Sequence, residues 1–179
     1  MSNLSKYYNK DLNTDIKVLT KSTPKIVVNE KLPELPNNIL VFARSNAGKT
    51  NALLNLISFY KKVFKTRILV VSKSYDVSLE SLRKGYGAEI FYSIYNDNGE
   101  NIIDKLINYQ KGRKAQKLKL QPYLILLEDM ISDNSLNKKR TPYDTLFSLG
   151  RHLNITTIIT SQSYTAIPSS LRRMCWTFF

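Results

Sequence analysis

The chain has 179 residues, a length at which one domain buries roughly 70% of its unfolded surface, so a second full domain is not expected. Hydrophobic residues make up 42% and charged residues 23%, which excludes collagen-like, low-complexity and wholly disordered chains. Lysine and arginine number 27 against 14 aspartates and glutamates, so the formal charge of +13 favours polyanionic partners such as nucleic acid.

Several protein classes are excluded by cysteine and histidine usage and by hydropathy. One cysteine, Cys175, and one histidine, His152, exclude a disulfide framework and a Cys-based zinc site, and we treat both as structural residues. No stretch approaches the ~20 apolar residues of a membrane span, and Met1 to Tyr8 lacks the apolar core of a signal peptide. We therefore expect a soluble, intracellular protein with no membrane partner.

Residues 1–36 are expected to form an N-terminal arm or lead-in. The first 24 residues are polar, Lys25 to Val28 has the pattern of a short edge strand, and Pro33 and Pro36 then interrupt the chain. From residue 37 onward, apolar runs typical of strands alternate with apolar residues at helical spacing. The strand patterns lie at 39–42, 68–71, 89–92, 123–127, 155–160 and 175–179, and the helical patterns at 51–64, at 102–109 and after the capping signal Thr141-Pro142.

This alternation predicts an α/β domain over residues 37–179, with a mainly parallel central sheet flanked by helices. Its strands are expected to be joined by right-handed crossovers. The chain stops on Phe178-Phe179 without a polar tail, which suggests that a longer protein was cut, or simply ends, near its final core strand.

A phosphate-binding loop is predicted between the first strand and the helix that follows it. The segment Ala43-Arg44-Ser45-Asn46-Ala47-Gly48-Lys49-Thr50 matches the P-loop pattern G-x-x-x-x-G-K-[ST], except that Ala43 replaces the first glycine. Backbone N–H groups and the helix N-terminus would wrap the β-phosphate, Lys49 would neutralise phosphate charge, and Thr50 would ligate Mg²⁺. We expect this segment, together with Asn51, to bind ATP.

A pair of acidic residues, Glu128-Asp129, ends the apolar run at 123–127. One carboxylate of such a pair holds Mg²⁺ through its waters, and the other can polarise the attacking water for hydrolysis. The common order is Asp then Glu, and here it is reversed. We assign Glu128 to the metal and Asp129 to the water, with the exchanged roles as the alternative.

Gln162 follows another apolar, β-branched run, on the side where open parallel sheets bind ligands. An amide at this place can sense the γ-phosphate. An ordinary loop amide is the alternative interpretation.

Three basic runs are candidates for holding DNA, because a motor that acts on any sequence must hold the phosphate backbone rather than the bases. They are Lys61-Lys62, Lys111 to Lys119, and Lys138-Lys139-Arg140. The last is the best candidate, since it lies in a polar loop just after the acidic pair, where hydrolysis could move it. A solvated charged face is the alternative for each run.

Four segments together resemble the FtsK-HerA group of P-loop ATPases, and most closely the DNA-packaging ATPases of large double-stranded DNA viruses and virophages. They are the P-loop, the acidic strand end at 124–129, the segment Gly150 to Ile155 leading into Thr160 to Ser163, and Ile167-Pro168 with Leu171-Arg172-Arg173. The resemblance spans about residues 37–179. It implies a RecA-like sheet in which the strand before Gln162 lies between the P-loop strand and the strand that ends in the acidic pair.

The resemblance also implies a homo-oligomeric ring, with nucleotide between neighbours and an arginine that reaches the γ-phosphate of the next subunit. The resemblance assigns this role to Arg151, with Arg172 and Arg173 as alternatives. The implied partners are double-stranded DNA and a capsid component. The implied location is the host-cell cytoplasm or viral factory, or the virion.

The hypothesis that combines these features is an ATP-driven motor that moves double-stranded DNA, as in packaging a viral genome into a capsid. A small P-loop kinase that acts on a nucleoside-like acceptor is one alternative. A nucleotide- and DNA-binding assembly module without turnover is another, because Ala43 and the inverted acidic pair depart from the usual pattern.

Overall fold

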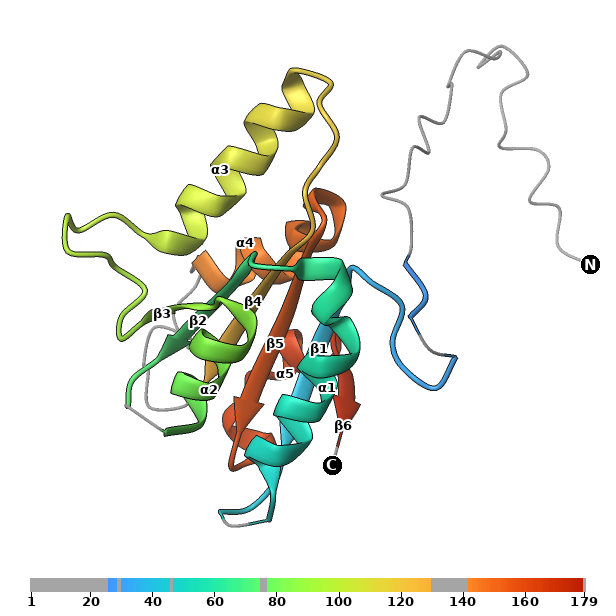
Figure 1. Cartoon of the computed structure of the whole chain (residues 1–179), viewed down its shortest axis with the longest axis vertical. Helices are drawn as coiled ribbons and strands as arrows, with labels where there is room; N and C mark the ends of the chain where they lie inside the picture. The colour runs from blue at the N-terminus through green and yellow to red at the C-terminus, as the bar shows by residue number, and fades with distance from the viewer. Residues whose placement is uncertain (1–25, 29, 46, 75–76, 130–141, 179) are drawn as a thin grey trace, which may run out of the picture.

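The computed structural model describes residues 26–28, 30–45, 47–74, 77–129 and 142–178 of the chain (Figure 1). Six strands form one parallel sheet in the order β3-β2-β4-β5-β1-β6. In chain order they are β1 (Asn38–Phe42), β2 (Ile68–Ser72), β3 (Glu89–Phe91), β4 (Tyr123–Glu128), β5 (Ile155–Ser161) and β6 (Trp176–Phe178). Because all neighbouring strands are parallel, their carboxyl ends lie at one edge of the sheet and their amino ends at the other.

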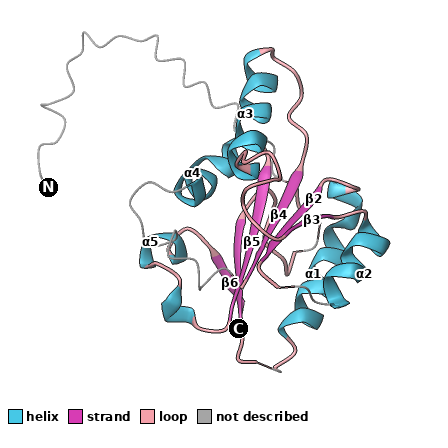
Figure 2. Cartoon of the chain, turned by 90° about the vertical axis from the view of Figure 1, so that its left-hand side faces the viewer, coloured by secondary structure: helices cyan, strands magenta, loops and turns pink. Residues whose placement is uncertain are grey.

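Helices cover both faces of the sheet (Figure 2). Helices α1 (Lys49–Phe64) and α2 (Val77–Tyr86) pack on one face. The other face carries α3 (Ile102–Ala115), α4 (Pro142–Leu149) and the short α5 (Ser169–Arg172), with the 3-10 helices η4 (Gly150–Leu153) and η5 (Tyr164–Ala166). None of the helices described combines the length and the apolar character needed to cross a membrane.

Strand β4 shows how the alternation of side chains separates the two cores. Leu124 and Leu126 belong to the core beneath α1, whereas Ile125 and Leu127 belong to the core beneath α3. The same alternation places Glu128, the last residue of the strand, on the α1 face. The strand therefore presents a carboxylate on the side of the sheet where the P-loop helix lies.

The predicted α/β fold with a parallel sheet is confirmed, and β5 lies between β1 and β4 as the resemblance implied. Sequence analysis did not predict helix α2. Among its described side chains only Leu79 and Leu82 are buried, so the helix has a very narrow apolar stripe and gives no clear helical pattern. The edge strand expected at Lys25 to Val28 is wrong for residues 26–28, which lie in none of the strands of the sheet, and Lys25 is outside the described residues. Ile26 instead forms an isolated antiparallel bridge with Leu35, and the outermost strands of the sheet are β3 and β6.

Candidate nucleotide site

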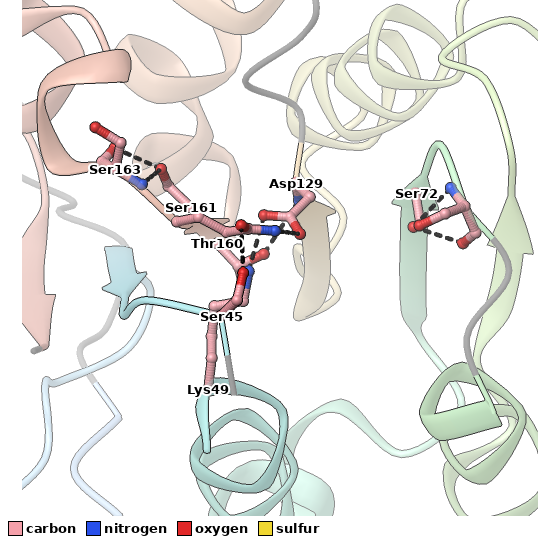
Figure 3. Close-up of polar contacts among 9 residues, drawn as sticks. Ser45, Lys49, Ser72, Asp129, Thr160, Ser161 and Ser163 are labelled. Atoms are coloured by element: carbon pink, nitrogen blue, oxygen red, sulfur yellow. Dashed lines mark hydrogen bonds and ion pairs between the residues drawn. The ribbon is translucent and has the colours of Figure 1, made fainter. Parts of the chain in front are cut away.

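The P-loop turns from the carboxyl end of β1 into the N-terminus of α1 (Figure 3). Gly48 adopts φ 81°, a left-handed conformation that glycine reaches without steric cost. Among the described residues, no side chain caps α1, and its first turn holds no acid. The free N–H groups and the positive end of the helix dipole therefore favour an anion here. Asn46, the middle of the predicted loop, lies outside the described residues.

Ala43 occupies the position where the usual pattern has glycine, and its backbone shows why alanine is tolerated. It is not among the residues with positive φ, so its methyl group creates no strain. Its N–H donates to the Ser161 carbonyl at 3.2 Å, which fastens the start of the loop to the end of β5. The departure at Ala43 is therefore compatible with a P-loop.

Asp129 is the centre of a polar network that joins three segments of the chain (Figure 3). Its Oδ1 pairs with Lys49 Nζ at 2.8 Å, and its Oδ2 accepts from Gln162 Nε2 at 3.1 Å. Ser45 Oγ donates to Gln162 Oε1 at 2.7 Å, and the Asp129 N–H donates to Thr160 Oγ1 at 3.2 Å. The P-loop, the acidic strand end and Gln162, which sequence analysis had selected separately, are thus joined by one series of hydrogen bonds.

The Lys49–Asp129 pair is only partly exposed, with relative side-chain exposures of 12% for the lysine and 35% for the aspartate. A pair that is shielded in this way is screened less by salt than one on the open surface. Asp129 has φ 46°, a conformation that turns the chain sharply after β4. That turn breaks the strand alternation and directs the carboxylate toward Lys49.

Glu128 and Thr50 are the residues that could hold a magnesium ion. Glu128 is buried, with 7% exposure, and lies on the α1 face at the end of β4, beside Ser72 of β2. Thr50 is the second residue of α1 and is half-buried. A carboxylate and a hydroxyl are hard oxygen donors of the kind that Mg²⁺ takes alongside nucleotide phosphates, so this pair fits the ion.

No group of three or more His, Cys, Asp or Glu side chains in the described ranges could hold a metal by itself.

Sequence analysis missed a hydroxyl turn that holds Gln162 in place. Ser161 Oγ donates to the Ser163 carbonyl at 2.6 Å and accepts from the Ser163 N–H at 3.0 Å, closing a turn around the glutamine. The same turn occurs at the end of β2, where Ser72 Oγ donates to the Ser74 carbonyl at 2.9 Å and accepts from its N–H at 3.4 Å. The signal was a Ser-x-Ser triplet at a strand end, since serine favours such local turns.

Arg151 lies at the opposite edge of the sheet from this network. It is an exposed residue of η4, just before the amino end of β5. Together with Arg173, Glu34 and Trp176 it lines a cavity of about 550 Å³ near the amino ends of β1 and β6. An arginine in this place cannot serve the nucleotide site of its own chain, and it is open to a neighbouring molecule.

Arg172, by contrast, is engaged within the chain. Its guanidinium lies 4.5 Å from the centroid of the Tyr164 ring, and that ring packs against Phe42 at 5.2 Å, next to the P-loop. A cation over an aromatic face is held by the electrostatic field of the ring. Arg172 is therefore a weaker candidate for reaching a neighbour than Arg151 or Arg173.

The two residues that sequence analysis treated as structural are not near the network. His152 lies beside Arg151 in η4, at the far end of β5 from Gln162. Burial raises the pKa of Cys175 to about 12, and its Sγ contacts the Leu171 carbonyl at 3.2 Å. Such a thiol is a poor nucleophile at neutral pH. Lys138, Lys139 and Arg140 lie outside the described residues.

A parallel sheet with this strand order, a P-loop after β1 and an acidic residue pair at the end of β4 defines the P-loop ATPase fold that the FtsK-HerA resemblance implied. Residues 25–179 match the family described as Poxvirus A32 protein, and the chain belongs to this family. The kinship with poxvirus-type packaging ATPases that the motifs implied is thereby confirmed. Among curated proteins, none is significantly similar to this chain in sequence.

Several solved structures share this fold. The pCW3 conjugation coupling protein TcpA has a TM-score of 0.60 and 13% identity, over 78% of this chain and 47% of that one. EssC from Geobacillus thermodenitrificans has a TM-score of 0.55 and 17% identity, over 78% of this chain and 30% of that one. This chain thus spans less than half of either protein.

A viral protein is matched over more of its length. B204, the DNA-packaging ATPase from Sulfolobus Turreted Icosahedral Virus, has a TM-score of 0.55 and 13% identity, over 80% of this chain and 76% of that one. At these identities the likeness shows the shared fold.

Proposed function

We propose that this chain is an ATP-hydrolysing motor that moves double-stranded DNA and packages a viral genome into its capsid. The observation that carries the proposal is the hydrogen-bonded series Ser45, Gln162, Asp129 and Lys49. It joins the P-loop, the acidic strand end and the candidate sensor in one site. Membership of the Poxvirus A32 family and the fold shared with the packaging ATPase B204 support the role.

ATP would bind along residues 43–51, with its phosphates over the N-terminus of α1 and the Lys49 ammonium. B204 from Sulfolobus turreted icosahedral virus 2 has been determined in complex with ATPγS, which supports nucleotide binding by this fold. The Thr50 hydroxyl and the Glu128 carboxylate would hold Mg²⁺. When bound, the ion would screen the charge of the β- and γ-phosphates.

Asp129 would act as the group that orients and deprotonates the attacking water. The Lys49 ammonium can pair with the Asp129 carboxylate or with a phosphate, so ATP binding would release the Oδ1 oxygen of Asp129. That oxygen could then accept a proton from water, while Gln162 holds the other oxygen. The rearrangement would make the catalytic base available only when nucleotide is present.

Arg151 would complete the site of a neighbouring subunit in a homo-oligomeric ring. Its place at the edge of the sheet opposite the P-loop supports action in trans, and Arg173 in the same cavity is the alternative. An arginine that approaches the γ-phosphate stabilises transition-state charge and raises the rate about 10³-fold or more. Turnover would then depend on assembly.

Lys138, Lys139 and Arg140 would contact the DNA backbone. They follow Asp129 closely in sequence, so a change at the nucleotide could move them. The +13 charge of the chain supports a polyanionic substrate. A capsid component would be the second partner, and the work would take place in the host-cell cytoplasm or viral factory, or in association with the virion.

The decisive experiment is Mg²⁺-dependent ATP hydrolysis by the wild-type chain and by Lys49→Ala, with and without linear double-stranded DNA. DNA-stimulated turnover that Lys49→Ala abolishes supports the motor. Turnover that is indifferent to DNA would instead favour the kinase. If the assembled ring binds nucleotide and DNA but does not hydrolyse ATP, the result would favour the assembly module without turnover.

A further inference from the structure

Helix α3 continues beyond the sheet as a basic projection, which we call the α3 arm and define as residues 111–119. The arm contains five basic residues and no acidic one. Figure 1 shows the C-terminal part of α3 standing clear of the sheet, at the end of the molecule opposite the P-loop. The arm leads into the amino end of β4, so it lies at the edge of the sheet away from the nucleotide.

Gln110 marks the point where the helix leaves the core. Its side chain is completely buried, and its Nε2 donates to the Leu153 carbonyl at 2.8 Å and to the Gln121 carbonyl. Before this point, Ile103, Leu106 and Ile107 of α3 are buried in the core. After it, the residues of the arm other than the half-buried Arg113 are exposed.

Arg113 holds the arm in one shape. Its Nε and Nη2 donate to the Lys119 carbonyl at 3.1 and 2.8 Å, and the Leu118 N–H donates to the Arg113 carbonyl at 2.9 Å. Lys117 adopts φ 57°, which reverses the chain at the end of the helix. A surface that is ordered in advance loses less conformational entropy when it binds a partner.

Four lysines of the arm, at positions 111, 114, 117 and 119, are left as exposed charges. Within the described part of the chain, none of them forms an ion pair, whereas Lys105 at the base of α3 pairs with Glu100 at 2.8 Å. A dense polyanion bound at the arm would relieve the mutual repulsion among these four positive charges. A second copy of this chain carries the same +13 charge and is electrostatically disfavoured as the occupant.

We propose that the α3 arm binds the phosphate backbone of duplex DNA, independently of base sequence. The inference rests on the proposed DNA motor function and adds a second contact to that expected of Lys138 to Arg140. Lysine contacts to phosphate oxygens carry no sequence information, so they suit a motor that acts on any sequence. The arm is joined to β4, the strand whose other end carries the acidic pair, yet it contributes no group to the nucleotide site.

The test compares two triple variants of equal charge in the full-length chain. The arm variant is Lys111→Gln, Lys114→Gln and Lys117→Gln, and the control is Lys31→Gln, Lys65→Gln and Lys84→Gln, three exposed lysines outside the basic runs that are candidates for holding DNA. Affinity for a fluorescent linear duplex of mixed sequence is measured from about 50 to 200 mM salt. Basal ATP hydrolysis and the unfolding midpoint are measured in parallel.

The arm variant is expected to lose on the order of tenfold in affinity, with a salt slope lower by about 0.9 for each phosphate contact removed. Its basal ATP hydrolysis and unfolding midpoint should stay at the wild-type values, and the control variant should keep both the affinity and the slope.

Equal losses in the two variants would overturn the inference, because only net charge would then matter. The arm variant could bind DNA as the wild type does, while a Lys138→Gln, Lys139→Gln and Arg140→Gln variant loses affinity. That result would overturn the inference that the arm binds DNA and would still support the proposed DNA motor. A wild-type chain that hydrolyses ATP but binds anionic vesicles and no duplex would overturn both.

Discussion

The Lys49 ammonium and the Asp129 carboxylate form an ion pair at 2.8 Å, which connects the first turn of α1 to the end of β4. The two residues are 80 positions apart in the sequence. Each of them is expected to have its own part in ATP hydrolysis, and here they neutralise one another. The pair makes the strength of nucleotide binding and the availability of the base depend on the same contact.

Replacing Asp129 with asparagine should separate these two effects. The Asp129→Asn side chain keeps its size but carries no charge, so Lys49 loses the one anionic partner that it has among the described residues. We expect ATP to bind more tightly, by up to about tenfold, because phosphate no longer competes with a carboxylate for the ammonium. Turnover should fall by about 100-fold or more, because the general base is lost.

Equilibrium binding of a fluorescent ATP analogue and steady-state hydrolysis check this prediction. Asp97→Asn, an exposed aspartate before α3, removes the same charge and should change neither measurement. Tighter binding together with nearly normal turnover would show that Asp129 is not the base. Glu128→Gln would then be expected to stop hydrolysis, and the two roles would be exchanged.

Ser161→Ala should weaken the positioning of Gln162 without touching the nucleotide. The substitution removes both hydrogen bonds of the hydroxyl turn, at 2.6 and 3.0 Å. We expect kcat to fall several-fold while KM for ATP changes little, because the glutamine is less well held against Asp129. Ser72→Ala removes the equivalent turn from β2 and is the matched control. A similar loss of kcat in both variants would indicate general destabilisation instead of positioning.

Much of the site could be predicted from sequence because it lies at strand ends. Asp129 follows β4 and Gln162 follows β5, while Lys49 is joined to β1 by the P-loop, and parallel strands bring their carboxyl ends to one edge. What sequence could not show was that Asp129 leaves the strand with φ 46° and faces Lys49, since that turn depends on the neighbouring β5. The polar partners supplied by Thr160 and Ser161 depend on the same strand order.

Other parts of the fold were hidden for different physical reasons. Helix α2 buries only Leu79 and Leu82 among its described side chains, too few for a periodic signal. Helix α3 was expected to end near residue 109, because its apolar residues stop there, yet it continues to Ala115 as an exposed helix. Hydrophobic periodicity reveals the half of a helix that packs and not the half that projects.

Arg151→Ala should impair hydrolysis only in the assembled protein. Arg151 lies at the edge of the sheet opposite the P-loop, so its loss should leave ATP binding by a single subunit unchanged. We expect turnover in the oligomer to fall by about 10³-fold. Mixing Arg151→Ala with Lys49→Ala subunits should restore activity at those interfaces where an intact P-loop faces an intact arginine.

Arg172→Ala is the matched control for that experiment. Its guanidinium lies over the Tyr164 ring, so the substitution should lower the free energy of unfolding by about 1 kcal/mol and leave turnover largely intact. Denaturant unfolding and hydrolysis by the assembled protein measure the two effects. If Arg173→Ala, and not Arg151→Ala, abolishes turnover, the other arginine of the cavity is the one that acts in trans.

Tyr60 should make the fold sensitive to alkaline pH. Its side chain is fully buried beneath the sheet, and its hydroxyl donates to the Pro33 carbonyl at 3.0 Å. Burial raises the pKa of Tyr60 from 10.0 to about 12, because the phenolate would be poorly solvated there. Since the pKa is higher in the folded state, the unfolded chain loses its proton first as the pH rises.

The stability that Tyr60 contributes is therefore complete below pH 10 and is lost as the pH rises toward 12, by an amount on the order of 2 kcal/mol. Tyr60→Phe removes the titrating group, so the free energy of unfolding of this variant should decline less over this interval. At pH 9 the variant should be about 1 kcal/mol less stable than the wild type, because it lacks the hydrogen bond to the Pro33 carbonyl. Urea unfolding of both proteins between pH 9 and 11 measures the difference in slope. Because burial also raises the pKa of Cys175 from 9.0 to about 12, both proteins are compared in a Cys175→Ala background. Parallel pH profiles in that background would mean that the Tyr60 hydroxyl titrates normally in the folded chain.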